Sequence, residues 1–310
     1  MDRIIMRAPA KINLSLDVTG KRDNGYHDVR MVMQQIGLSD EIIIEKVNYD
    51  PLLKGSAENM GDVCNDRITV ETNSETLPVN EDNLVYKAAK LIMEECGIDE
   101  CVHIYIDKQI PIAAGMAGGS TDAAAVLKGM NMLFNCNLTD ERLRELGVKI
   151  GADIPYCIMG GTALAEGIGE ILTPLPPMPY CTILIAKPGI SVSTGYVYTA
   201  FDSLKEKYHP DVDGMVKSIE EKILDNISKL LGNSLEGVTQ EEYPVIKQIK
   251  EIMLGNGAKG ALMSGSGPTV FGLFDDGDKA KMALEKIRAS GIAKNVFLTE
   301  PYMNGSGYGD

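Results

Sequence analysis

The sequence predicts an α+β fold, in which strands and helices are mixed along the chain without strict alternation. Residues 1–20 alternate and are rich in β-branched side chains, which is typical of strands. Residues 83–96 carry apolar side chains at helical spacing, and several helical segments follow residue 190 in succession. A doubly wound parallel sheet would need regular strand–helix–strand repeats, so a mixed architecture is favoured. The 310 residues suffice for one large domain or two of ordinary size.

The first half of the chain is predicted to be rich in strands. In order, we predict strands over 1–20, 29–36 and 41–47, a helix over 83–96, a strand over 102–107, and helices over 120–134 and 139–150. Residues 21–25 contain an Asn-Gly pair, which is typical of a tight turn. Glu81 and Asp82 precede the first helix, where negative charge favours a helix N-terminus. Residues 50–66 are polar and irregular.

The second half is predicted to contain more helices. In order, we predict a strand over 181–187, helices over 194–203, 213–231 and 241–254, a strand–Gly turn–strand unit over 259–274, a helix, and a last strand over 294–299. The proline-rich run PLPPMP at 174–179 is predicted to be a surface loop and a candidate domain boundary.

The charge of the chain limits the classes of partner. Thirty basic residues against 44 acidic ones give a net charge of −14, which argues against a general nucleic-acid binder. Small anions remain possible, because backbone N–H groups hold phosphate even on an acidic protein. The six cysteines and three histidines are scattered without zinc-ligand spacing, and free thiols suit a reducing, cytoplasmic location. We expect no signal peptide and no membrane span.

The segment PIAAGMAGGSTDAAA (residues 111–125) combines a flexible loop with a strong helix start. Gly115, Gly118 and Gly119 allow the backbone to lie close to a ligand. Ser120, Thr121 and Asp122 are all N-cap types, so we predict that the helix starts there. Unsatisfied N–H groups at such a start attract phosphate. The alternative is a tight strand-to-helix turn without a ligand. The string GNGAKG at 255–260 follows a helix, so we predict a turn there and not a dinucleotide site.

The N-terminal segment APAKINLSLDVTGKRDNGYHD (residues 8–28) offers polar groups on one strand face and at a hairpin tip. Lys11 and Asn13 are two residues apart, so both side chains share a face of the strand. Tyr26 and His27 follow the Asn-Gly turn and provide an aromatic face and a ring with two hydrogen-bonding nitrogens, which suit a nucleobase. The alternative is a hairpin tip with incidental polar residues.

Two further segments carry candidate site residues. In GADIPYC (residues 151–157), Asp153 lies among apolar residues, and a partly buried carboxylate needs a partner. It is either a base or charge partner for Lys11, or simply the cap of a turn. In SGSGPTVFGLF (residues 264–274), small residues lie between two apolar strands. They form either a hairpin turn or a second backbone surface that faces the ligand.

Taken together, these segments resemble the GHMP kinase superfamily. The family shows a Lys-bearing N-terminal strand, a central P-x-x-x-G-L-x-G-G-S-S loop and a late Gly-Ser-Gly segment, matched here in order by APAKINL, PIAAGMAGGST and SGSGPTVFGLF. Met116 stands where Leu is usual and Thr121 where Ser is usual. The resemblance covers about residues 5–275, and neither 50–66 nor the tail after 300 matches a motif.

The resemblance implies a two-domain fold. The N-terminal domain would be ribosomal-protein-S5-domain-2-like, bind ATP and carry the catalytic residues over 1–165. The C-terminal domain would be a ferredoxin-like α/β sandwich over 166–310 on the substrate side. Superfamily members include monomers and homodimers, so either state is expected.

The GYH and GADIP segments resemble the branch of the superfamily that phosphorylates the 2-hydroxyl of a cytidine-diphosphate-linked methylerythritol, a step of the non-mevalonate route to isoprenoid precursors. That resemblance implies ATP and Mg²⁺ as cofactors, Lys11 and Asp153 as the catalytic pair, and Ser120 or Thr121 as a possible metal ligand. The implied ATP-binding residues are Pro111, Ile112, Ala113, Ala114, Gly115, Met116, Ala117, Gly118, Gly119, Ser120, Thr121 and Asn83. The implied substrate-binding residues are Asn13, Tyr26, His27 and Thr194.

Other functions remain open from the sequence. A GHMP kinase acting on homoserine or mevalonate would keep the phosphate loop but would not need an aromatic residue beside a His. A non-catalytic nucleotide sensor would keep the glycine loop without a base, and the presence of both Lys11 and Asp153 disfavours it. A purely structural protein would make three separate Gly-rich segments a coincidence.

Overall fold

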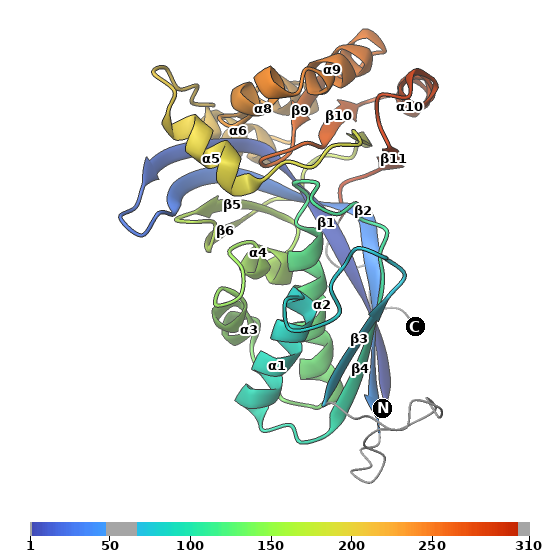
Figure 1. Cartoon of the computed structure of the whole chain (residues 1–310). Coiled ribbons are helices and arrows are strands. Elements are labelled where there is room, and N and C mark those ends of the chain that lie inside the picture. Colours follow the sequence, from blue (N-terminus) through green and yellow to red (C-terminus); the bar gives the residue numbers. More distant parts are fainter. Residues whose placement is uncertain (1, 48–66, 303–310) are drawn as a thin grey trace.

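The structure, a computed structural model, describes residues 2–47 and 67–302 and contains two β-sheets with helices packed on them (Figure 1). The polar stretch 50–66 and the tail from residue 303 onward lie outside the described residues. None of the described helices is both long and apolar enough to cross a lipid bilayer.

The larger sheet has seven strands and is built on the long antiparallel hairpin of β1 and β2 (Figure 1). The strand order is β3-β4-β2-β1-β8, and β5 pairs with both β2 and β6. The strands are β1 (Arg3–Lys21), β2 (His27–Val47), β3 (Ile68–Thr72), β4 (Cys101–Asp107), β5 (Thr162–Glu166), β6 (Ile171–Leu175) and β8 (Gly232–Asn233).

Four helices lie on one side of this sheet (Figure 1). They are α1 (Leu84–Cys96), α2 (Gly118–Leu133), α3 (Asp140–Gly147) and α4 (Ile154–Met159). Helices α1 and α2 pack against the strands of the sheet, and α3 and α4 pack on α2. The alanine run of α2 is fully buried against β1 and α1, because its small side chains let the elements approach closely. Helix α1 begins where the sequence predicts, with Asn83 as its N-cap.

The smaller sheet has four antiparallel strands in the order β11-β7-β10-β9. Its strands are β7 (Thr182–Lys187), β9 (Gly260–Met263), β10 (Val270–Phe274) and β11 (Asn295–Thr299). The accompanying helices are α5 (Thr194–Asp202), α6 (Val212–Glu220), α7 (Leu224–Lys229), α8 (Glu236–Glu242), α9 (Val245–Gly255) and α10 (Gly277–Ser290). Helices α9 and α10 pack on this sheet.

Strand β1 contributes to the cores of both halves of the molecule. Its residues Ala10, Ile12 and Leu14 are fully buried with apolar residues of the smaller sheet. Because side chains alternate along a strand, Lys11 and Asn13 point to the opposite face. Lys11 lies in the middle of this 19-residue strand, as the strand predicted over 1–20 implies.

Several predicted boundaries need correction. The strands predicted over 29–36 and 41–47 form one strand, β2, because pairing with β1 continues past Gly37. The helix predicted over 213–231 is divided into α6 and α7, where Lys222 adopts a left-handed backbone. The helix predicted over 241–254 corresponds to α9, and its first two residues belong to a separate helix, α8, which Pro244 cannot extend because it has no N–H.

The proline-rich run 174–179 is not wholly a loop. Its first two residues belong to β6, which pairs only with β5 among the described strands, and proline is tolerated in such an edge strand. The short strands β3, β5 and β8 carry too little periodicity to be predicted. Strands β6 and β8 lie after residue 165 but join the larger sheet. The division into domains at residues 165/166 stays a prediction.

Candidate active site

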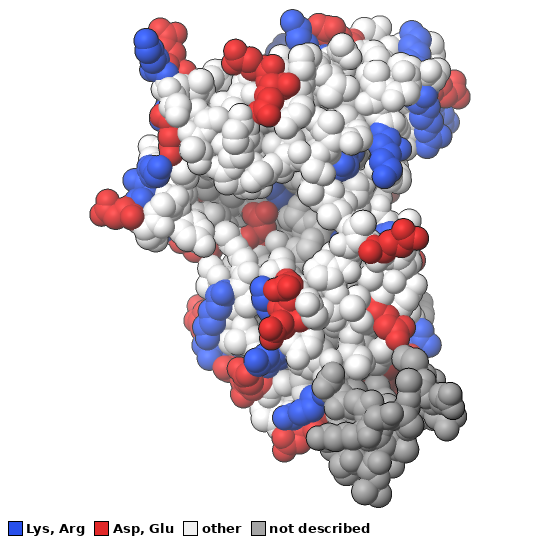
Figure 2. Space-filling model, viewed as in Figure 1, with Lys and Arg blue, Asp and Glu red and all other residues white. Residues whose placement is uncertain are grey.

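A cavity of about 870 Å³ lies between the two halves of the molecule. Figure 2 shows it as a hollow with charged side chains at its floor. Its walls come from the tip and middle of the β1–β2 hairpin, the glycine loop with the start of α2, the turn before α4, the start of α5, and the segment after β9. Segments far apart in the sequence therefore meet at one site.

Helix α2 begins at Gly118, two residues earlier than the sequence predicts. Its N-cap residue is Ala117, which has a left-handed backbone (φ 57°) and makes no side-chain cap. The N-cap types that follow are used elsewhere: Thr121 Oγ1 donates to the Pro9 carbonyl at 2.8 Å, and Asp122 pairs with Lys108. The unsatisfied N–H groups are therefore those of the residues from Gly118 onward.

The start of α2 has the properties of an anion site. Gly118, Gly119 and Ser120 all line the cavity. Their N–H groups belong to the first turn of the helix, where the helix dipole is positive. A phosphate group bound there would be held by backbone donors, as the glycine loop predicts.

The late segment after β9 packs directly on the glycine loop. Ser264 Oγ donates to the Gly115 carbonyl at 2.9 Å, and Gly265 and Ser266 line the cavity. Gly115 has φ +70°, and a Cβ there would lie 2.2 Å from the Ser264 carbonyl oxygen. The segment is thus the second backbone surface of the site and not merely a hairpin turn.

This packing gives a test of the glycine loop. Gly115→Ala is expected to lower the free energy of unfolding by about 1–3 kcal/mol, because the new Cβ meets backbone and the left-handed conformation is strained. Gly119→Ala is the matched control: its Cβ would meet only Leu84 Cδ1, at 3.5 Å. Urea unfolding of both variants measures the difference. Equal stability of the two would show that Gly115 is not needed for its lack of a side chain.

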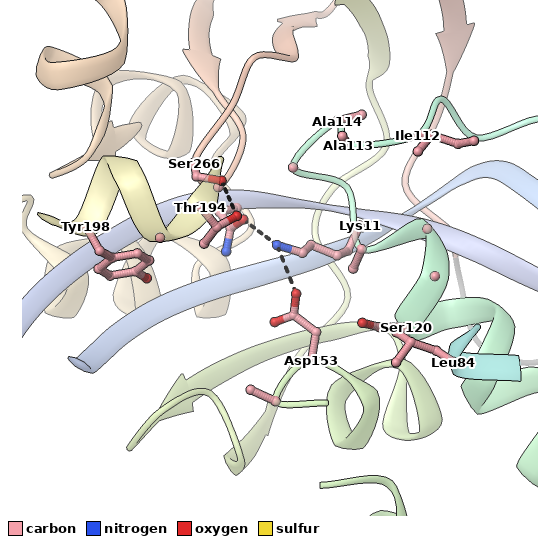
Figure 3. A pocket seen from close by; sticks show the side chains of 18 of the residues that line it. Lys11, Leu84, Ile112, Ala113, Ala114, Ser120, Asp153, Thr194, Tyr198 and Ser266 are labelled. Atoms are coloured by element: carbon pink, nitrogen blue, oxygen red, sulfur yellow. Dashed lines mark hydrogen bonds and ion pairs between the residues drawn. The ribbon is translucent and has the colours of Figure 1, made fainter. Parts of the chain in front are cut away.

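Lys11 and Asp153 point toward one another in the cavity and form an ion pair (Figure 3). Lys11 is only 5% exposed; its Nζ donates to Asn13 Oδ1 at 2.7 Å and lies 3.8 Å from Asp153 Oδ2. Asp153 precedes α4, yet its carboxylate caps none of the N–H groups of that helix. The reading of Asp153 as a turn cap is therefore wrong, and the carboxylate is free to face a ligand. Ser120 lies on one side of the pair and Thr194 on the other.

Tyr26 and His27 lie at the other end of the cavity, on the tip of the hairpin. Tyr26 is 57% exposed, so its ring is available for stacking. His27 is nearly buried and packs against Tyr198, with ring centroids 4.7 Å apart. His27 Nε2 lies 2.8 Å from Asp202 Oδ1, and Lys21 Nζ lies 2.7 Å from Asp202 Oδ2. The tip thus presents one open aromatic face and one oriented imidazole.

Most of the predicted site residues are brought together, but two are not. Thr194 lines the cavity and its hydroxyl lies 2.9 Å from that of Ser266. Asn83 also lines it, although both ends of its amide are engaged: Oδ1 accepts from Val85 N and Nδ2 donates to the Pro78 carbonyl. Met116 and Thr121 were predicted to bind ATP but do not line the cavity. Met116 belongs to the core, and the Thr121 N–H and hydroxyl bond to the backbone.

The predictions missed a buried ion cluster beneath the glycine loop. Lys108 Nζ contacts Asp40 Oδ2 at 2.5 Å and Asp122 Oδ2 at 2.7 Å. Burial alone would lower the pKa of Lys108, but its two carboxylate partners outweigh burial and raise that pKa. Burial also raises the pKa of Asp122 well above its usual range. A Cβ on Gly118 would lie 3.0 Å from Lys108 Nζ, so the position of Lys108 favours a residue without a side chain at 118.

Comparisons with known proteins agree with this fold and site. The family model of the GHMP kinases N terminal domain matches residues 83–161, and that of the GHMP kinases C terminal domain matches residues 215–293. A 4-diphosphocytidyl-2-C-methyl-D-erythritol kinase of Lachnospira eligens is 49% identical over 97% of this chain and 99% of its own length. One from Lachnoclostridium phytofermentans is 50% identical over 96% and 97%. The crystal structure of a 4-(cytidine 5'-diphospho)-2C-methyl-D-erythritol kinase has a TM-score of 0.77 at 30% identity, over 97% of this chain and all of that one.

The fold and the cavity define a GHMP kinase: two matched family domains meet at a glycine loop, a Lys–Asp pair and a polar hairpin tip. Within this class, the chain is 49–50% identical to two kinases of one substrate over nearly their whole length. The chain belongs to the family of 4-diphosphocytidyl-2-C-methyl-D-erythritol kinases.

Proposed function

We propose that this protein transfers the γ-phosphoryl group of ATP to the 2-hydroxyl of 4-diphosphocytidyl-2-C-methyl-D-erythritol. The observation that supports this most strongly is that one cavity joins a helix start suited to phosphate, a Lys–Asp pair and an aromatic–imidazole tip. The names of the relatives support the same substrate. The reaction forms a bond between the hydroxyl oxygen and the γ-phosphorus, and releases ADP and a proton.

The glycine loop and the start of α2 would hold the phosphates of ATP. Phosphoryl transfer passes through a loose transition state, so positioning and charge stabilisation supply most of the catalysis. The N–H groups of Gly118, Gly119 and Ser120 would bind the phosphate oxygens without any reorganisation of the backbone. The adenine would lie by the segment Asn83–Val85 at the start of α1, where Asn83 acts through the shape of the helix start because its amide is already bonded.

Asp153 would act as the general base. Its carboxylate is partly exposed to the cavity and would accept the proton of the attacking hydroxyl. Lys11 would steady the charge of that carboxylate and of the transferred phosphoryl group. Asn13 Oδ1 accepts a hydrogen bond from Lys11 Nζ and so fixes the position of the ammonium group.

The site also fits a Mg²⁺ ion bound with ATP. Among residues 2–47 and 67–302, no group of three or more His, Cys, Asp or Glu residues could hold a metal. In kinases Mg²⁺ keeps waters and phosphate ligands and needs only one or two protein oxygens. Ser120 lines the cavity and remains the candidate ligand, whereas Thr121 points away. Asp122 Oδ1 is buried in the same wall without a hydrogen-bond partner in the described parts of the chain. When bound, the ion would offset the charge of the β- and γ-phosphates.

The cytosine would bind at the hairpin tip, between the open face of Tyr26 and the imidazole of His27. Tyr26→Ala is expected to raise the KM of the cytidylated substrate, because it removes base–aromatic stacking worth about 1–3 kcal/mol of binding free energy. The KM of ATP should change little, since Tyr26 lies away from the glycine loop. Steady-state kinetics with each substrate varied in turn would measure both constants.

The control for this variant is Tyr180→Ala, which removes another exposed tyrosine outside the cavity. An unchanged substrate KM in Tyr26→Ala would remove Tyr26 from the cytidine site. A rise of equal size in both variants would point to a general loss of structure.

The function as a whole is tested by ADP release from purified protein and ATP, with and without 4-diphosphocytidyl-2-C-methyl-D-erythritol. Release that depends on this substrate supports the proposal. Release with homoserine or mevalonate instead would assign another GHMP activity. Binding of ATP without release of ADP in the presence of any of these substrates would indicate a non-catalytic nucleotide sensor.

Two further properties belong to this proposal. Cys96, Cys136, Cys157 and Cys181 are free thiols, which supports a cytoplasmic location for the enzyme. We retain a monomer or homodimer as its state, and light scattering of the purified protein decides between them.

A further inference from the structure

The hydrogen bonds of His27 bear on which pyrimidine the cavity accepts. Asp202 Oδ1 lies 2.8 Å from His27 Nε2. The other oxygen of the same carboxylate accepts from Lys21 Nζ at 2.7 Å, and this bond lowers the pKa of Asp202 below its usual value. Asp202 is therefore an ionised acceptor, and Nε2 must be the ring nitrogen that donates to it.

Lys21 balances the charge of Asp202 in this cluster. Lys21 and Asp202 already form an ion pair, so the carboxylate has a cationic partner without protonation of His27. The His27 side chain is 9% exposed and packs on the ring of Tyr198, so the position of the imidazole is fixed by packing. A neutral ring that donates through Nε2 keeps a lone pair on Nδ1.

The cavity then offers an acceptor at Nδ1. His27 lines the cavity, and none of residues 2–47 and 67–302 contributes a hydrogen bond to Nδ1. A ligand group that meets this nitrogen must be a donor. The 4-amino group of cytosine is a donor, whereas the carbonyl oxygen at the same position of uracil is an acceptor and would face another lone pair.

We propose that Asp202 is a positioning residue that fixes His27 as the Nε2–H tautomer and thereby makes the site select a pyrimidine with a 4-amino group over one with a 4-carbonyl group. This inference rests on the proposed function, in which the hairpin tip binds the base. Asp202 and His27 are 175 residues apart in the sequence, and the contact also joins α5 to the hairpin tip.

The substitution Asp202→Asn tests the tautomer directly. The Lys21 ammonium can only donate, so it would hold the carbonyl oxygen of the new amide and turn its NH₂ group toward His27. Nε2 would then have to accept, and the ring proton would move to Nδ1. A donor at Nδ1 suits the carbonyl of uracil, so the base preference should disappear or reverse.

The experiment compares CDP and UDP binding to the full-length protein by calorimetry. Wild type is expected to bind CDP at least about tenfold more tightly than UDP, and Asp202→Asn is expected to bring the two within about twofold or to favour UDP. Asp202→Glu keeps the carboxylate and should restore part of the preference. Asp213→Asn, the same chemical change at an exposed site outside the cavity, is the control and should keep the wild-type ratio.

Nitrogen NMR of ¹⁵N-histidine-labelled protein provides a readout that a merely structural role would not move. The chain has only three histidines, and the signals of His27 are those lost in His27→Gln. Wild type should show a proton on Nε2 only, and Asp202→Asn a proton on Nδ1. A doubly protonated or Nδ1–H ring in wild type would overturn the inference, even if Asp202→Asn failed to fold.

The outcomes separate this inference from the proposed function. If wild type binds neither CDP nor UDP, the cytidine site itself is wrong and both fail. If substrate-dependent ADP release is present but CDP and UDP bind equally, the proposed function stands and the role of Asp202 is refuted. An unchanged CDP/UDP ratio in Asp202→Asn also refutes it.

Discussion

Asp153→Asn is expected to lower kcat by about 10²–10⁴-fold, because the amide keeps the shape of the carboxylate but cannot accept the proton of the attacking hydroxyl. The KM of ATP should stay near its wild-type value, since the proposed phosphate donors are backbone N–H groups of α2 that the substitution leaves unchanged. Steady-state ADP release measures both constants.

The control for this substitution is Asp99→Asn, whose side chain is 98% exposed and lies outside the cavity. It should leave both kinetic constants unchanged. A turnover number near that of wild type in Asp153→Asn would show that another group removes the proton, and the assignment of the base would fall.

Lys11→Met is expected to lower kcat by about 10²–10³-fold, comparable with the loss of one preorganised donor from a charged transition state. The substitution keeps the length of the side chain in a buried position but removes the ammonium that lies 3.8 Å from Asp153 and 2.7 Å from Asn13. Single-turnover rates at saturating ATP would separate this loss from weaker binding.

Lys128→Met is the matched control, because Lys128 also donates from its ammonium group, here to the Ile158 carbonyl, outside the cavity. The double variant of Lys11 and Asp153 adds a second check. If the two residues act as a unit, the double variant should be scarcely slower than the slower single variant. A Lys11→Met rate within about twofold of wild type would reduce Lys11 to a packing residue.

The sequence is sufficient to predict those parts of the site that depend on local chemistry. The glycine loop, the shared strand face of Lys11 and Asn13 and the helix predicted over 83–96 each follow from residues close together in the chain. The GHMP resemblance supplies the link between Lys11 and Asp153, which lie far apart in sequence and 3.8 Å apart in space.

The errors arise where distant parts of the chain compete for the same residue. The start of α2 was placed too late because Thr121 and Asp122 are good caps, yet the Pro9 carbonyl and Lys108 bind them instead. The cluster of Lys108 with Asp40 was missed for the same reason, since only the fold brings these charges together.

The hydrogen bond between Ser264 and Gly115 has a consequence for biosynthesis. It joins positions 149 residues apart, so the glycine loop precedes the segment that packs on it by almost half the chain. During translation, the ribosome therefore synthesises the glycine loop long before the segment that packs on it. Catalytic competence should emerge only near the end of translation, and fragments that stop short of residue 266 should be inert however well their N-terminal halves fold.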